Sequence, residues 1–153
     1  KTYCLAESLG ISIPYTEYVP NPITLDKPSY PFVLKACGGH GGTQVYMVRN
    51  DEEFHIAKNA LSGIPSVLQK PVSDLGKDLR VYVLGKSVIA AMLRTSKNDF
   101  RSNFCLGGSA EPYQLSEKEY AVIRTFCDAL PFGFVGIDFI ALNIALNATS
   151  VLP

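Results

Sequence analysis

A lysine and a cluster of glycines stand side by side in residues 31–49, PFVLKACGGHGGTQVYMVR. Lys35 follows a short apolar run, and the loop after it has four glycines around a histidine: Gly38, Gly39, His40, Gly41 and Gly42. Because glycine has no Cβ and readily adopts positive φ, such a loop can turn its N–H groups toward an anion at close range. Lys35 can bring an ammonium to the same anion. The pattern predicts a phosphate-binding loop, with a plain β-hairpin turn as the alternative.

The spacing differs from that of three better-known phosphate loops. A P-loop has its lysine and a Ser/Thr after the last glycine, at the start of a helix, whereas residues 43–46 here have the pattern of a strand. A dinucleotide fingerprint also begins a helix, and its glycine spacing is not met. A kinase glycine loop joins two strands, but its lysine lies downstream, and the chain has neither an HRD nor a DFG motif. A lysine that precedes the loop distinguishes this sequence from all three.

Charged side chains further along the chain suit the binding of a nucleotide or an acid. Asp78 and Arg80 stand at the start of an expected strand. The Asp78 carboxylate can accept hydrogen bonds from a ribose. Arg80 can equally form a surface ion pair, which contributes little to stability. Arg94 ends a strand, and Arg101 and Asn103 follow in a polar loop. Guanidinium groups supply forked donors for phosphate or carboxylate, so we expect these three residues to contact anions.

Asp138 interrupts the most apolar segment of the chain, residues 132–148. A carboxylate is costly to bury without a partner, so its place in an apolar strand needs an explanation. Two interpretations stay open at this point. Asp138 is either a structural carboxylate held by hydrogen bonds or a ligand of Mg²⁺, which favours carboxylate oxygens together with phosphates.

Composition excludes several classes of protein. In 153 residues, 47% are hydrophobic and 18% charged, which is typical of a globular chain and unlike a disordered one. Fourteen basic residues balance fourteen acidic ones, so nothing favours nucleic acid or an anionic membrane as partner. No apolar run approaches the roughly 20 residues of a membrane span. The four cysteines have neither CxxC pairs nor zinc spacing, which predicts free thiols and a cytoplasmic location.

Periodicity and turn residues predict the order helix, strand, hairpin, helix, strand, hairpin, loop, helix, strand. Helices are expected near residues 2–9, 50–61 and 116–130, the last two with capping boxes. Strands are expected near residues 11–13, 32–34, 45–48, 67–70, 79–84, 88–93 and 134–140. Two antiparallel hairpin sheets with helices between them make an α+β fold, with a natural cleft near residues 71–76.

Five motifs follow one another along the chain: PFVLKACGGHGG, VLQKPV, GKDLRVYVLG, AAMLRTSKNDFRSNFCLGG and FVGIDFI. Together they resemble an ATP-grasp domain, closest to the RimK-like group that includes ribosomal-protein glutamate ligases. The resemblance covers residue 1 to about residue 140 and implies two antiparallel-sheet α+β subdomains with the nucleotide cleft between them. It implies a glycine-loop lid subdomain at about 25–72 and a core-sheet subdomain at about 73–140, within a partial ATP-grasp domain over residues 1–153.

The resemblance also implies ATP and Mg²⁺ as cofactors and a role for each candidate residue. The strand lysine and glycine loop hold phosphates, the hinge strand presents backbone to adenine, and the next acidic residue contacts ribose. The nucleotide-binding residues are then Lys1, Lys35, Gly38, Gly39, His40, Gly41, Gly42, Gln69, Lys70, Pro71, Val72 and Asp78. Arg94, Arg101 and Asn103 fall at the catalytic positions, and Asp138 falls at a metal ligand.

The implied reaction is ATP-dependent carboxylate–amine ligation through an acyl phosphate, with an unidentified acid and amine as substrates. Two departures from the family pattern bear on it. Lys70 stands where the hinge residue is usually acidic, and residues 141–153, ALNIALNATSVLP, contain no carboxylate where the family has a second metal-ligand strand. A nucleotide-binding module without turnover is therefore the alternative. With no initiator Met and no family N-terminal domain, the chain is expected to be a piece of a longer protein and inactive by itself.

Overall fold

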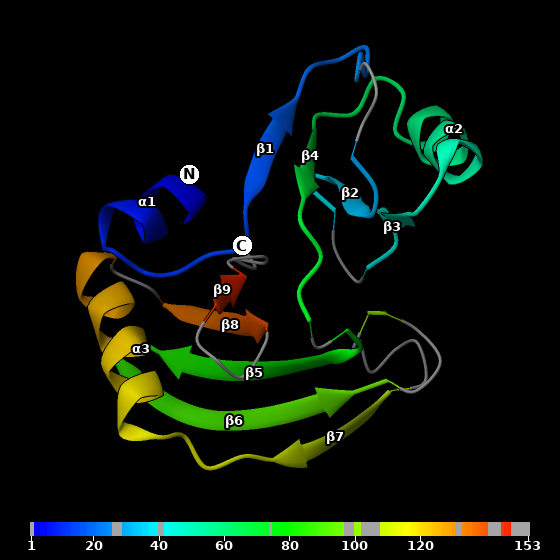
Figure 1. The fold of residues 1–153 in the computed structure, drawn as a ribbon. Helices are drawn as coiled ribbons and strands as arrows, with labels where there is room; N and C mark the ends of the chain where they lie inside the picture. The colour runs from blue at the N-terminus through cyan, green and yellow to red at the C-terminus, as the bar shows by residue number, and fades with distance from the viewer. Residues whose placement is uncertain are drawn as a thin grey trace. The chain divides into compact units, whose positions relative to one another are not determined.

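The computed structural model describes residues 2–25, 29–39, 42–73, 75–96, 100–101, 108–130, 133–140 and 145–147. The chain forms two compact units, one of Pro14–Pro71 and one of Lys1–Ile13 with Val72–Pro153. Each unit is built on its own antiparallel sheet (Figure 1). The predicted α+β class is confirmed.

The Pro14–Pro71 unit has a four-stranded sheet in the order β1-β4-β2-β3, with one helix packed on it. Its elements are β1 (Thr16–Val19), β2 (Phe32–Ala36), β3 (Val45–Val48), α2 (Asp51–Ala60) and β4 (Ser66–Gln69). The apolar run before Lys35 becomes β2, with Phe32, Val33 and Leu34 all buried. The helix begins where expected, because the Asn50 side chain accepts a hydrogen bond from the Glu53 N–H.

The other unit has a five-stranded sheet in the order β7-β6-β5-β8-β9. Its elements are α1 (Thr2–Ser8), β5 (Lys77–Leu84), β6 (Ser87–Thr95), β7 (Ser109–Pro112), α3 (Glu117–Ala129), β8 (Phe134–Ile140) and β9 (Ala145–Asn147). The capping box predicted for α3 is confirmed, since Ser116 and Glu119 bond each other's backbone N–H. Gly85 makes the β5–β6 turn with φ of 61°, as the Gly85-Lys86 pair predicts.

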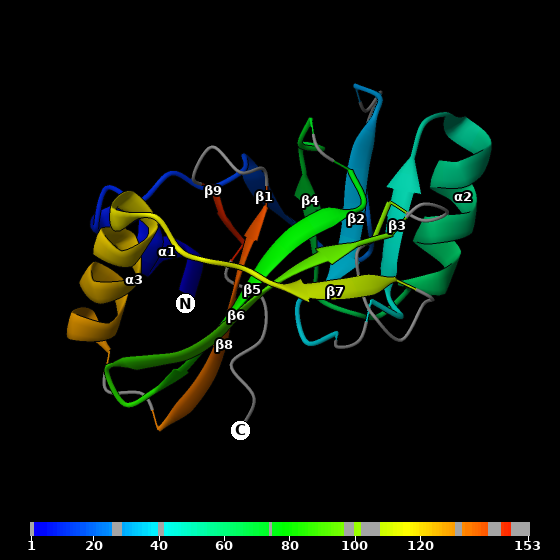
Figure 2. The same ribbon diagram turned by 90° about the horizontal axis from the view of Figure 1, so that it is seen from below.

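Alternation along β5 separates a core face from a polar face. Leu79, Val81 and Val83 are buried in one cluster with side chains of α1 and α3, and both helices lie beside this sheet (Figure 2). Asp78 and Arg80 alternate with them and so lie on the opposite face. This face of β5 carries Asp78 and Arg80, two of the charged residues singled out in the sequence.

One predicted strand does not form, and two observed strands were not predicted. The strand expected over residues 11–13 does not form, and the first strand begins at Thr16, two residues after Pro14. No strand was expected at β7 or β9. Three of the four cysteines, Cys4, Cys37 and Cys127, are free thiols as predicted, and Cys105 lies outside the described residues.

Candidate functional site

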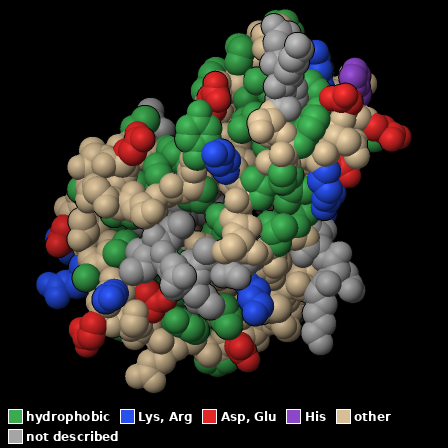
Figure 3. Space-filling model, viewed as in Figure 1, with side chains coloured by type: hydrophobic (Ala, Val, Ile, Leu, Met, Phe, Trp, Pro, Cys, Tyr) green, Lys and Arg blue, Asp and Glu red, His purple; other side chains and the backbone are tan. Residues whose placement is uncertain are grey.

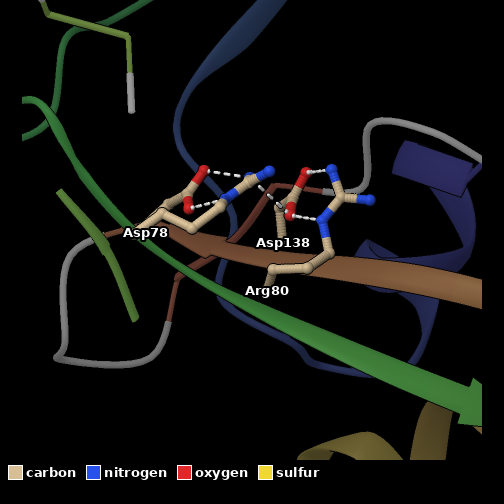
Figure 4. A network of polar contacts seen from close by, with 4 residues as sticks. Asp78, Arg80 and Asp138 are labelled. Atoms are coloured by element: carbon tan, nitrogen blue, oxygen red, sulfur yellow. Dashed lines mark hydrogen bonds and ion pairs between the residues drawn. The ribbon is translucent and has the colours of Figure 1, made fainter. Parts of the chain in front are cut away.

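Four charged side chains form one hydrogen-bonded network on the polar face of the five-stranded sheet (Figure 4). Arg94 donates to Asp78 through Nε, at 2.6 Å from Oδ1, and through Nη2, at 2.5 Å from Oδ2. The same Nη2 lies 3.0 Å from Asp138 Oδ1. Arg80 donates from Nη2 to Asp138 Oδ2 at 2.8 Å, and its Nε forms an ion pair with Oδ1.

Strand register brings these residues together from distant parts of the sequence. β5 lies between β6 and β8, so Asp78 stands opposite Arg94 on one side and Arg80 stands opposite Asp138 on the other. Because side chains alternate along a strand, Asp78 and Arg80 share a face, and their partners share it with them. The predicted residues Asp78, Arg94 and Asp138 are therefore neighbours.

Arg80 is not the surface ion pair that the sequence left open. Its side chain is 14% exposed, against 12% for Arg94, 11% for Asp78 and 9% for Asp138. Charged groups are this deeply buried only when paired and hydrogen-bonded. Sequence reasoning named Arg80 without giving it a role. The one signal available was its place two residues after Asp78 on the same strand face.

Burial and neighbouring charges act in opposite directions on Asp138. Burial favours the neutral carboxyl, the Arg80 and Arg94 guanidiniums favour the ionised one, and the nearby Asp78 opposes ionisation; burial prevails and raises the pKa of Asp138 to about 7. For Arg94, burial disfavours the charged form, but hydrogen bonds to Asp78 and the charges of Asp138 and Asp78 raise its pKa.

Gly136 makes room for the Arg80 side chain. A Cβ on Gly136 would lie 2.4 Å from Arg80 Nη1, 3.2 Å from Cδ and 3.3 Å from Cζ. Gly136 and Asp138 are two residues apart on β8, so they share a face of the sheet. The guanidinium therefore lies over the backbone of β8 at Gly136, beside the Asp138 carboxylate.

Lys35 belongs to a second polar row, inside the Pro14–Pro71 unit. Its Nζ donates to Gln69 Oε1 at 3.0 Å, Gln69 Nε2 donates to Thr16 Oγ1 at 2.8 Å, and that hydroxyl donates to the Pro14 carbonyl at 3.1 Å. Thr16 stands opposite Gln69 in the β1–β4 register. The row fixes the direction of the ammonium, and sequence reasoning missed Thr16 because nothing in TEYV distinguishes it.

The described glycines of the loop have different structural needs. Gly42 adopts φ of 75°, a conformation that favours glycine. A Cβ on Gly39 would make ordinary contacts at 3.6 Å, and a Cβ on Gly38 would meet nothing within 4 Å. The fold itself therefore explains the glycine at position 42 but not at position 38.

Lys70 of the predicted hinge and Arg101 of the predicted polar loop make contacts outside these two groups of polar residues. The Lys70 N–H donates to the Tyr15 carbonyl at 2.9 Å, and its Nζ lies 5.8 Å from the Tyr15 ring centroid. Arg101 lies over the Phe100 ring, at 5.5 Å from its centroid. Lys1, His40, Gly41 and Asn103 lie outside the described residues.

Asp138 fits a magnesium ion that is held mainly by a ligand. Among the described residues no group of three or more His, Cys, Asp or Glu could enclose a metal ion. Magnesium is commonly held by one or two carboxylates together with substrate phosphates, and Asp138 can supply one. In the β8–β9 register Asn147 stands opposite Asp138.

Charge is dispersed on the surface drawn in Figure 3. On that face, Lys/Arg and Asp/Glu side chains of the described residues are interspersed rather than gathered by sign. This agrees with fourteen basic and fourteen acidic residues in the sequence. Within the described ranges, no helix has the length and apolar character needed to cross a membrane.

Solved structures with the same fold include a synthetase in complex with ADP and a ligase in complex with ATP. N5-carboxyaminoimidazole ribonucleotide synthetase in its ADP complex superimposes with a TM-score of 0.72 at 20% identity, over 95% of this chain and 42% of that one. D-alanine–D-alanine ligase from Bacillus anthracis complexed with ATP gives 0.69 at 13% identity, over 95% and 51%. At these identities the likeness concerns the fold, which is ATP-grasp.

Sequence comparison assigns the chain to a family, which is more specific than a shared fold. The family described as the RimK-like ATP-grasp domain matches residues 14–150, and the chain belongs to that family. A probable alpha-L-glutamate ligase of Xanthomonas axonopodis pv. citri is 32% identical over 149 residues, 92% of this chain and 50% of that protein. Human N-acetylaspartylglutamate synthase A is 32% identical over 120 residues, 74% and 30%. The chain thus spans half or less of the length of these relatives.

Proposed function

We propose that the chain is the ATP- and Mg²⁺-binding part of an ATP-dependent carboxylate–amine ligase. In this reaction a carboxylate oxygen attacks the γ-phosphorus of ATP, ADP leaves, and an amine then displaces phosphate from the acyl phosphate. Membership of the RimK-like family over residues 14–150 carries the proposal. Glutamate is the first substrate to test, since relatives are named probable alpha-L-glutamate ligases.

Lys35 and the glycine loop would bind the phosphates. Gln69 holds the Lys35 ammonium at 3.0 Å, so the charge is oriented before a nucleotide arrives. Gly38 has open space where a Cβ would be, which permits close approach of a phosphate to the backbone. Positioned donors of this kind stabilise the negative charge that moves onto the leaving ADP.

Adenine recognition would depend on few backbone donors. In the hinge at residues 69–72, the Lys70 N–H already donates to Tyr15, Pro71 has no N–H, and Gln69 lies in β4 between two strands. Val72 is therefore the N–H that we propose for adenine. Asp78 remains the proposed ribose contact, and Arg94, Arg101 and Asn103 remain the proposed contacts to the reacting anions.

Asp138 would hold the metal. When bound, Mg²⁺ neutralises phosphate charge and orients the transferred group. In the chain itself, Arg94 orients Asp138 by donating to Oδ1 while Asp78 anchors Arg94 through two bonds. Positioning of this kind matters because an error of about 1 Å can cost on the order of a hundredfold in rate.

The test is calorimetric titration of the 153-residue chain with ATP and ADP, with and without Mg²⁺. Lys35→Ala removes a charge-assisted phosphate contact worth about 1.5–3 kcal/mol, so ATP affinity should fall by roughly ten- to a hundredfold. Lys118→Ala, an exposed lysine on α3, is the control and should bind as wild type does. Equal ATP affinity in wild type and Lys35→Ala would contradict the assignment of Lys35.

A nucleotide-binding module without turnover is the second candidate. Residues 141–153 contain no carboxylate, and this favours it, because Asp138 is then the one carboxylate that residues 138–153 offer to a metal ion. The two candidates differ in a measurable way. Steady ADP release that depends on an added carboxylate and amine, by the protein that contains this chain, supports the ligase, and nucleotide binding by that protein without such release supports the module.

A further inference from the structure

We propose that Gly76 is a positioning residue for Arg101, because its backbone holds the segment from which this arginine extends. The inference rests on the proposed function, since it takes Arg101 as a contact to the reacting anions. Gly76 lies directly before β5, is buried, and has φ of 76°. Its carbonyl accepts from the Ser96 N–H at 2.7 Å, and its N–H donates to the Phe100 carbonyl at 2.9 Å.

The two hydrogen bonds of Gly76 go to different residues at the end of β6. In the β5–β6 register Lys77 stands opposite Thr95, so the next position places Gly76 opposite Ser96. A hydrogen-bonded pair in a regular antiparallel ladder exchanges both N–H···O bonds. Here Gly76 accepts from Ser96 but donates to Phe100. A single residue therefore holds the chain both where it leaves β6 and where it reaches Arg101.

Phe100 connects Gly76 to the Arg101 side chain. The Arg101 Cζ lies 5.5 Å from the centroid of the Phe100 ring, within the range of cation–π attraction. The ring under the guanidinium and the carbonyl bonded to Gly76 belong to the same residue. Fixing the Phe100 backbone limits the directions in which the guanidinium can point, so Gly76 acts on Arg101 through Phe100.

The backbone conformation explains why residue 76 is a glycine. A residue with a Cβ is strained at positive φ, whereas glycine is not. A change of φ rotates the N–H of a residue relative to its own C=O. Another residue that relaxed toward negative φ could not keep both the bond to Phe100 and the bond to Ser96. Because a buried N–H needs an acceptor, the bonded arrangement is maintained as long as residue 76 can adopt this φ.

Gly85 provides a matched control in the same hairpin. It makes the turn at the other end of β5 with φ of 61°, and a Cβ there meets nothing within 4 Å. Gly85→Ala and Gly76→Ala therefore introduce a similar backbone strain in the same pair of strands. The Gly85 N–H donates to the Gly133 carbonyl at 2.7 Å, away from Arg101. The control separates the position of Gly76 from the general cost of a Cβ at positive φ.

The first experiment observes the Arg101 Nε–H by ¹⁵N–¹H NMR, with the signal identified by its loss in Arg101→Lys. The current of the Phe100 ring shifts the signals of a guanidinium that lies over it. Gly76→Ala should move the Arg101 signal toward the position of an exposed arginine, and Gly85→Ala should leave it in place. An Arg101 signal that is the same in wild type and Gly76→Ala would overturn the inference.

The second experiment compares ATP with adenosine by calorimetry. Arg101→Ala removes a charge-assisted contact, so ATP affinity should fall by roughly ten- to a hundredfold. Gly76→Ala keeps the charge but not its direction, so ATP affinity should fall by less, about three- to tenfold. Adenosine has no phosphates, and its affinity should not change. In the Arg101→Ala background Gly76→Ala should add nothing, because residues that act through one another are not additive.

The outcomes separate this inference from the proposed function. A loss of ATP affinity in Gly76→Ala that disappears in the Arg101→Ala background supports the inference. A loss that persists there, or one no larger than in Gly85→Ala, overturns it and leaves the proposed function intact. ATP affinity equal to wild type in Arg101→Ala contradicts the proposed role of Arg101 and overturns the inference with it.

A second form of the chain keeps the test decisive if Gly76→Ala does not fold. An ester in place of the Leu75–Gly76 amide removes the N–H that donates to Phe100 and adds no Cβ. The same loss of ATP affinity, dependent on Arg101, is expected for this chain. ATP affinity equal to wild type in the ester chain would overturn the inference.

Discussion

Thr16→Val tests whether the polar row behind Lys35 prepares the lysine for a phosphate. The substitution keeps the shape of the side chain and removes its hydroxyl. That hydroxyl accepts from Gln69 Nε2 at 2.8 Å and donates to the Pro14 carbonyl at 3.1 Å. Gln69 is 5% exposed, so its Nε2 cannot simply exchange Thr16 for bulk water.

Each consequence of the substitution has an expected magnitude. A buried donor that loses its acceptor costs about 1–3 kcal/mol of unfolding free energy, and each kcal/mol lowers the melting temperature by about 2–4 °C for a chain of this size. The Gln69 amide then holds Lys35 less firmly. If one net hydrogen bond of about 0.5–1.5 kcal/mol is lost from the bound state, ATP affinity falls by about two- to tenfold.

The assay compares ATP with adenosine by calorimetry, alongside a denaturant titration. Adenosine has no phosphates, so its affinity should not change in Thr16→Val, whereas ATP affinity should fall. Thr16→Ser keeps the hydroxyl and should restore ATP binding. If ATP and adenosine affinity fall together, the row only supports the sheet. If Thr16→Val binds ATP as wild type does, Lys35 does not depend on the row.

Two further predictions concern the loop and the last helix. Gly42→Ala should lower the unfolding free energy by about 1–2 kcal/mol, because a Cβ is strained at φ of 75°. Gly38→Ala should leave stability unchanged and weaken ATP binding. The opposite pattern in thermal melting and calorimetry would contradict our account of the loop. Ser116→Ala removes the capping box of α3 and should cost about 0.5–2 kcal/mol in urea denaturation, while the exposed Ser62→Ala should cost nothing measurable.

Local sequence patterns predict most of the elements because their causes are local. The Ser116–Glu119 capping box and the Gly85 turn each depend on residues a few positions apart. β7 has no such local cause. Its four residues, SAEP, are all exposed, and they form a strand by pairing with β6. The strand expected over residues 11–13 does not form for a related reason. Ile11 is buried in the core that the five-stranded sheet shares with α1 and α3, so the apolar alternation there reflects packing rather than strand pairing.

Three members of the charged network were singled out in the sequence one by one, but their arrangement was not. Asp78, Arg94 and Asp138 were each identified by type and position, and their contact depends on β5 pairing with β6 and β8 in one register. A shift of one residue would move a whole strand's side chains to the other face, and the sequence alone does not specify the register. Arg80 and Thr16 are in the site only because of register.

The two interpretations that the sequence left open for Asp138 are compatible, and this limits what its own mutation can show. As a structural carboxylate, Asp138 forms ion pairs with two buried guanidiniums, so Asp138→Asn should destabilise the chain by about 3–5 kcal/mol, as expected when a buried ion pair loses one member. As a proposed metal ligand, the same variant should also lose Mg²⁺-dependent nucleotide binding. Both losses have the same sign, and a partly unfolded protein would produce either.

Arg80→Met separates the two roles because its effects have opposite signs. Removing the guanidinium takes a partner from Asp138, so the unfolding free energy should fall. It also leaves two carboxylates facing one guanidinium, and that excess of negative charge favours a divalent cation. A less stable chain that binds Mg²⁺ more tightly cannot be explained by general damage to the fold. The sign of that second change therefore tests whether Asp138 binds metal more directly than any substitution of Asp138 itself.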